Sequence, residues 1–141
     1  MDSILRILSL DHGTVRIGVA VTDEMQMIAQ PLDYVDAEPP EKIIQYLENT
    51  WAGQLEFILV GMPRNMNGTY GPAATKVQAF VERLQKALDV PIRTWDERLT
   101  SAQANRVMIE ADVRRDKRKQ KVDSMSAAIL LQSYLDGNSG A

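Results

Sequence analysis

The sequence predicts an α/β domain with a mixed five-stranded sheet, an antiparallel meander followed by two parallel strands, flanked by helices. Two aliphatic segments near the N-terminus are separated by a turn too short for a parallel crossover. Further along the chain, short apolar runs alternate with segments of helical periodicity, which is typical of strand–helix units. A length of 141 residues, 45% of them hydrophobic, suffices for one buried core.

The first part of the chain predicts the meander. Residues 4–10 and 16–22 are rich in aliphatic side chains, and the turn between them contains Gly13. A weaker third strand is expected at residues 32–35. The first two strands should be antiparallel neighbours, because so short a connection permits no other arrangement, and the third would complete the meander.

The middle of the chain predicts two helices and two buried strands. Apolar residues recur at helical spacing after Pro40, over residues 41–51, and again over residues 72–88. Short apolar runs at residues 57–60 and 90–95 predict the two strands that pair in parallel.

Two further helices are expected near the C-terminus. Thr100 and Gln103 have the spacing of a capping box, so a helix should begin there and end near residue 111. A final helix is expected over residues 122–135, with its inward positions at Met125, Ile129 and Ala128. We expect one domain, residues 1–136, and a flexible C-terminal tail, residues 137–141.

The composition narrows the chemistry that this chain can carry out. It has no cysteine and a single histidine, which excludes disulfides and makes a zinc site improbable. No apolar run reaches 18 residues, and the N-terminus lacks the basic start of a signal peptide. The expected location is the cytoplasm, with no membrane partner.

One segment is strongly basic, although the chain has a net charge of −3. Residues 114–121 read RRDKRKQK, and such a strip on an acidic body can bind phosphates. A solvated loop is the alternative. The candidate nucleic-acid-binding residues in this segment are Arg114, Arg115, Lys117, Arg118, Lys119 and Lys121.

Three carboxylates occupy positions where an α/β sheet commonly forms its binding crevice. Asp11 ends the first predicted strand, Glu97 follows the last one, and Asp123 opens the final helix. Together they suit Mg²⁺ or Mn²⁺, which prefer oxygen ligands, and such ions can drive phosphodiester hydrolysis. Singly they could be a turn former, a surface residue and a helix cap. If the fourth strand lies between the first and the last, Asp11 and Glu97 are roughly 10 Å apart, a gap that Gly61 could help to close.

Four stretches resemble the motifs of one bacterial family. They are LDHGTVRIGVAVTD (10–23), VGMPRNMNG (60–68), WDERLTSAQA (95–104) and KVDSMSAAILLQSYL (121–135). Their order and spacing are similar to those of the YqgF family, also called RuvX, which is described as a nuclease of pre-16S ribosomal RNA or as a Holliday junction resolvase. Because the motifs extend over almost the whole chain, the resemblance is specific.

The resemblance implies a ribonuclease H-like fold related to the RuvC resolvases. It assigns the acidic catalytic and metal-binding residues to Asp11, Glu97 and Asp123, and the family's basic loop to residues 114–121. Val15 departs from the family, whose members often have lysine there, and this departure could weaken a phosphate contact.

Neighbouring residues could support the site. Arg16 and Arg98 could each pair with a phosphate, the alternatives being a solvated charge and a surface ion pair. His12 is expected to be a solvent-exposed turn residue rather than a base. Thr100 and Ser101 are expected to cap a helix rather than bind phosphate.

The leading hypothesis is therefore a metal-dependent nuclease acting on structured nucleic acid, with pre-16S rRNA processing preferred. Cleavage of four-way DNA junctions is an alternative and would call for a homodimer, whereas RNA trimming is open to a monomer or a homodimer. A non-catalytic RNA-binding factor in transcription or ribosome maturation is another alternative. An actin-like ATPase or sugar kinase, suggested by residues 10–21, is disfavoured because such proteins need two domains.

Overall fold

The computed structural model describes residues 5–63, 70–96 and 124–139. The helix expected from Thr100, the basic segment 114–121, Glu97 and Asp123 lie outside the described residues. The predicted positions of those features therefore stay predictions.

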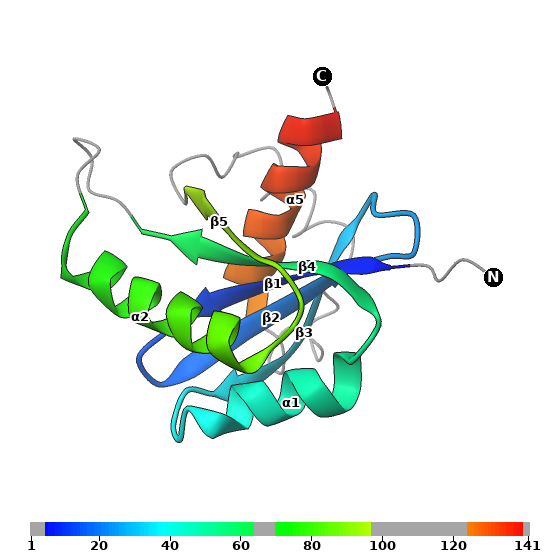
Figure 1. Ribbon diagram of the computed structural model, residues 1–141. Coiled ribbons are helices and arrows are strands. Elements are labelled where there is room, and N and C mark those ends of the chain that lie inside the picture. Colours follow the sequence, from blue (N-terminus) through cyan, green and yellow to red (C-terminus); the bar gives the residue numbers. More distant parts are fainter. Residues whose placement is uncertain (1–4, 64–69, 97–123, 140–141) are drawn as a thin grey trace.

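A five-stranded mixed sheet forms the centre of the structure (Figure 1). Its order is β3-β2-β1-β4-β5; β1 pairs antiparallel with β2, β2 antiparallel with β3, and β1-β4-β5 are parallel. The predicted fold class, an antiparallel meander with two added parallel strands, is confirmed. The strands are β1 Arg6–His12, β2 Arg16–Thr22, β3 Ala29–Asp36, β4 Leu55–Met62 and β5 Ile92–Asp96.

Helices cover both faces of this sheet, with α1 and α2 on one face and α5 on the other (Figure 1). The helices are α1 Glu41–Trp51, α2 Pro72–Ala87 and α5 Met125–Ser139. Pro72 opens α2, a position where proline loses no hydrogen bond. No helix within the described residues is long and apolar enough to cross a membrane.

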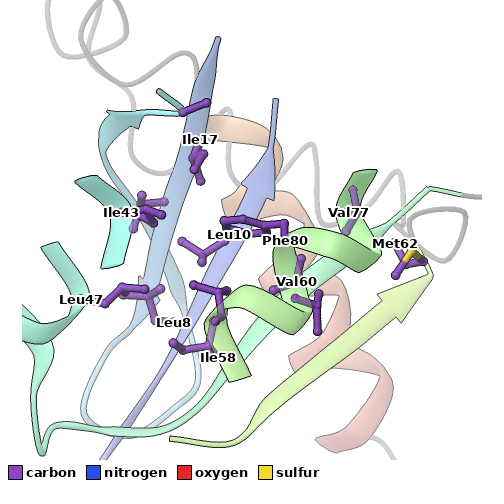
Figure 2. Packing of buried hydrophobic residues seen from close by; sticks show 14 of the residues in the cluster. Leu8, Leu10, Ile17, Ile43, Leu47, Ile58, Val60, Met62, Val77 and Phe80 are labelled. Atoms are coloured by element: carbon purple, nitrogen blue, oxygen red, sulfur yellow. The ribbon is translucent and has the colours of Figure 1, made fainter. Parts of the chain in front are cut away.

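Alternation along the strands divides the core into two clusters. Leu8 and Leu10 of β1 point to α1 and α2, as do Ile58 and Val60 of β4, and Figure 2 shows them meeting the helix side chains. Ile7, Phe57 and Leu59, which alternate with them, pack under α5 instead. The residues of α5 in this second cluster are Ala127, Ala128, Leu130, Leu131 and Leu135.

Several strands extend past their predicted ends, β1 and β3 among them. β1 continues through Asp11 and His12, so the hairpin turn begins at Gly13, whose N–H donates to the carbonyl of Arg16 at 3.0 Å. β3 spans eight residues rather than the four predicted. In both cases partner strands supply the backbone hydrogen bonds that the side-chain pattern does not reveal.

The final helix differs from the prediction in its inward positions and in its end. Met125 and Ile129 are only partly buried, whereas Ala128 is fully buried as expected. The helix continues to Ser139, past residue 137 where the tail is expected to begin, and the flexibility of residues 137–141 stays a prediction. At Gly137 the helix lies close to Trp95 of β5, where a Cβ would meet the indole ring at 3.7 Å.

Candidate active site

Asp11 lies near the end of the central strand, on the face of the sheet covered by α5. It alternates with Leu10 and His12, which face α2, and it follows Ser9, whose hydroxyl reaches α5. Across the antiparallel ladder Asp11 pairs with Gly18. On the other side Leu10 pairs with Val60, so the next residue of β4 beside Asp11 is Gly61. The Asp11 carboxylate therefore stands between two residues without side chains.

The start of α5 is bound to the sheet next to this position. Ser9 Oγ donates a buried hydrogen bond of 2.7 Å to the carbonyl of Ala127. Val19 N–H donates another of 3.0 Å to Ser124 Oγ. Because Val19 follows Gly18, the partner of Asp11, the first turn of α5 is held one residue away from the Asp11–Gly18 pair.

A second polar connection fixes the middle of the same helix. Ala29 N–H donates to Gln132 Oε1 at 2.9 Å, and Gln132 Nε2 donates to the carbonyl of Met27 at 3.2 Å. Gln132 is buried, and its bond from Ala29 is shielded from water, whereas its bond to Met27 is partly exposed. The helix therefore has a defined register along the sheet and not merely an apolar contact with it.

β5 lies on the other side of β4 from β1, and its residue Trp95 faces α5 as Asp11 does. Trp95 pairs with Gly61 and packs edge-on against Tyr134 of α5, with ring centres 5.1 Å apart. Trp95 Nε1 is buried and has no hydrogen-bond partner among the described residues. Because β4 lies between β1 and β5, the backbones of β1 and β5 are about 10 Å apart, as the sequence analysis anticipated for this strand order.

Arg16 lies at the start of β2, on the same face as Asp11. Its Cζ lies 4.7 Å from the centre of the Tyr34 ring, within cation–π range. Arg16 is exposed, as is Val15 beside it in the hairpin turn. The Arg16 side chain is therefore accessible at the start of β2, and its contact with a phosphate stays a prediction.

His12 is half-buried rather than a solvent-exposed turn residue, so that expectation is wrong. Its ring packs against Phe80 of α2 with centres 4.6 Å apart, because β1 continues through this position. Burial lowers the pKa of His12 from its ordinary value of 6.5, outweighing the nearby Asp11 and Glu38 carboxylates, which raise the pKa. His12 lies on the opposite face from Asp11 and is a packing residue.

No cluster of three carboxylate or imidazole side chains suited to a metal occurs within the described residues. Of the predicted ligands, the structure describes Asp11 alone, and Asp11 has the oxygen donors that Mg²⁺ prefers. Glu97 directly follows the last residue of β5, and Asp123 directly precedes Ser124. Trp95, two residues before Glu97, and Ser124, directly after Asp123, lie on the α5 side of the sheet.

Several positioning residues escaped the sequence analysis. Ser9, Ser124 and Gln132 are buried polar residues that connect the sheet to α5. Ser9 had a visible signal, since it is the one polar residue inside the aliphatic run ILSL at positions 7–10. Ser124 and Gln132 had no such signal, because polar residues in a helix of unknown orientation are normally expected to face solvent.

Comparison with known proteins identifies the family. A family model described as "RuvX: Holliday junction resolvase" matches residues 5–137. The "Putative pre-16S rRNA nuclease" of Halothermothrix orenii is 45% identical over 133 residues, covering 94% of this chain and 95% of that protein. The protein of the same name from Desulforamulus reducens is 46% identical over 133 residues, covering 94% and 97%. The chain belongs to the RuvX family, whose members are named as nucleases.

The structure of T. thermophilus RuvC in complex with Holliday junction substrate is a more distant match. It covers 96% of this chain and 97% of that chain, with a TM-score of 0.48 and 16% sequence identity. A likeness at this level assigns no residue of the present site.

Proposed function

We propose that this protein is a metal-dependent nuclease that hydrolyses phosphodiester bonds in structured nucleic acid, with pre-16S ribosomal RNA as its substrate. The supporting observation is the position of Asp11 on the α5 face, between Gly18 and Gly61 and beside the bound first turn of α5. Glycines on both sides allow a phosphate backbone to approach the carboxylate closely. Membership of a nuclease family and the names of the relatives support the choice of reaction and substrate.

Glu97 and Asp123 are proposed as the other two acidic ligands. Trp95 lies on the α5 face, and side chains alternate along a strand, so continuation of the β5 pattern would direct Glu97 to that face. Asp123 adjoins Ser124, which is held beside Gly18's neighbour Val19. These placements would bring both carboxylates toward that of Asp11.

The proposed cofactor is Mg²⁺ or Mn²⁺, because the acidic residues supply only oxygen donors. Bound divalent ions would activate the attacking water and stabilise the departing oxygen. The chain's own residues would hold the ions and position the strand, with Arg16, Arg98 and the basic segment 114–121 contacting phosphates. A substrate of this kind would place the protein in the cytoplasm.

A cleavage assay tests the proposal. Purified protein is incubated with precursor 16S rRNA, or with a four-way DNA junction, in the presence of Mg²⁺ or Mn²⁺. Asp11→Asn and Glu97→Gln should each lower the rate at least about 100-fold while the protein stays folded, because each removes a metal-binding charge at nearly constant volume. Unchanged cleavage by Asp11→Asn would refute the proposed site.

Junction cleavage is the second candidate, favoured by the description of the family model that matches this chain. Symmetric cutting of two strands would require a dimer, so a monomer in solution that cuts RNA but not the junction would exclude it. If neither substrate is cut, yet Asp11→Asn supports ribosome maturation in cells, the protein acts instead as a binding factor.

A further inference from the structure

Five residues form a row across the α5 face of the sheet at the level of Asp11. Asp11 pairs with Gly18, Gly61 pairs with Trp95, and the β1–β4 ladder places Gly61 beside Asp11. The fifth member of the row, on the edge strand β3, is Tyr34. A carboxylate thus has a glycine on each side and an aromatic residue beyond each glycine.

A β-bulge accounts for the placement of Tyr34. Ile17 pairs with Val35 and Val19 with Leu32, so Asp33 and Tyr34 together oppose the single residue Gly18. Bulges of this kind redirect side chains and are common beside active sites. The bulge lies opposite Gly18, and the N–H of the next residue, Val19, donates to Ser124 Oγ at the start of α5.

Tyr34 is exposed, and the guanidinium group of Arg16 lies over its ring. Arg16 alternates with Ile17, which faces α1 and α2, so Arg16 and the ring beneath it lie on the face of Asp11. The Tyr34 side chain retains 37% of its exposure and joins neither of the two apolar clusters of the described residues. The ring is therefore not committed to the hydrophobic core.

We infer that the Arg16–Tyr34 pair is a stacking site for an unpaired nucleobase of the strand whose phosphate lies at Asp11. This inference rests on the proposed function. Aromatic rings and guanidinium groups are the surfaces on which proteins stack unpaired bases. The site lies two strand spacings from Asp11, roughly 10 Å, and Gly18 is the residue of β2 that lies between them. A base near the cleaved bond, on the same nucleic-acid strand, can therefore reach the Arg16–Tyr34 pair.

The inference specifies the substrate more narrowly than the proposed function does. Bases inside a continuous duplex are stacked on each other and cannot rest on a protein side chain without unpairing. The nuclease should therefore prefer an unpaired or splayed nucleotide next to the cut, as found in single-stranded or branched regions.

Binding of a fluorescent oligonucleotide tests the stacking site separately from catalysis. Single-stranded RNA oligonucleotides carrying 2-aminopurine at successive positions, whose fluorescence falls on stacking, are titrated with the full-length protein in EDTA. We expect quenching at one or two adjacent positions. Tyr34→Leu should abolish the quenching and weaken binding about 5- to 100-fold, whereas Tyr34→Phe, which keeps the ring, should retain both.

The matched control is Met25→Ala, which removes another exposed apolar side chain at the far end of the β2–β3 hairpin and should change nothing. Full affinity and quenching in Tyr34→Leu would overturn the inference, as would losses in Tyr34→Phe equal to those in Tyr34→Leu. It would also be overturned if Tyr34→Leu weakened binding of a blunt duplex as much as binding of the single strand, or if the unchanged protein did not bind the oligonucleotide. A second variant, Tyr34→Thr, retains strand propensity and guards against misfolding. Quenching that depends on Tyr34 without any cleavage by the unchanged protein would uphold the stacking site and refute the proposed function.

Discussion

Single polar side chains determine where α5 lies relative to Asp11. The hydroxyls of Ser9 and Ser124 are fully buried, and each has a backbone partner on the opposite element. A buried hydrogen bond adds little net stability when made, but leaving its partner unsatisfied is costly. These serines therefore disfavour any other register of the helix on the sheet, and the register brings residue 124 close to the proposed site.

Substitution of Ser124 tests this role. Ser124→Ala removes the acceptor of the Val19 N–H, so we expect the free energy of unfolding to fall by about 1–3 kcal/mol. Ser126→Ala is the matched control: Ser126 is exposed on the same turn, and its replacement should change stability by less than about 0.5 kcal/mol. Urea unfolding of both variants measures the difference, and equal values would refute the positioning role of Ser124.

At the scale of elements, the sequence patterns predicted which segments pair but not how far they extend. Alternation and short turns sufficed for β1, β2 and the parallel strands, because those features are local. The length of β3 depends on a partner distant in sequence, the strand β2, and the local pattern likewise did not predict that α5 continues to Ser139. The position of Asp11 near the end of its strand was predictable from the local pattern. The placement of Tyr34 was not, because its orientation comes from a bulge that only the pairing register reveals.

The end of α5 provides a prediction at this scale. Gly137→Ala should stabilise the protein by up to about 0.5–1 kcal/mol, because alanine favours a helix and its Cβ would meet Trp95 at an ordinary 3.7 Å. Gly53→Ala should instead destabilise it by about 1 kcal/mol, since Gly53 has a φ of +74°. Thermal unfolding distinguishes the two, and no gain at residue 137 would favour the flexible tail.

At the scale of the whole molecule, charge is distributed unevenly along a chain of net charge −3. Most of the sequence is acidic and would repel nucleic acid, while residues 114–121 contain six basic side chains. A nuclease of this composition would depend on that segment to hold its substrate, in addition to Arg16 at the end of the sheet.

The salt dependence of binding tests this charge distribution. Replacing Lys117, Arg118, Lys119 and Lys121 with serine should weaken RNA binding and reduce the slope of log affinity against log salt by up to about 3, because fewer counterions are released. Filter binding over a range of KCl concentrations measures the slope. A slope identical to that of the unchanged protein would assign the segment to solvent.

Locating the bound metal tests the central claim most directly. Crystals of the protein grown with Mn²⁺ and measured at the manganese absorption edge would reveal the ion by its anomalous scattering. We predict a manganese peak within about 2.5 Å of an Asp11 carboxylate oxygen, with Glu97 and Asp123 completing the ligands directly or through water. A manganese ion bound elsewhere, with the three carboxylates too far apart to share it, would contradict the account.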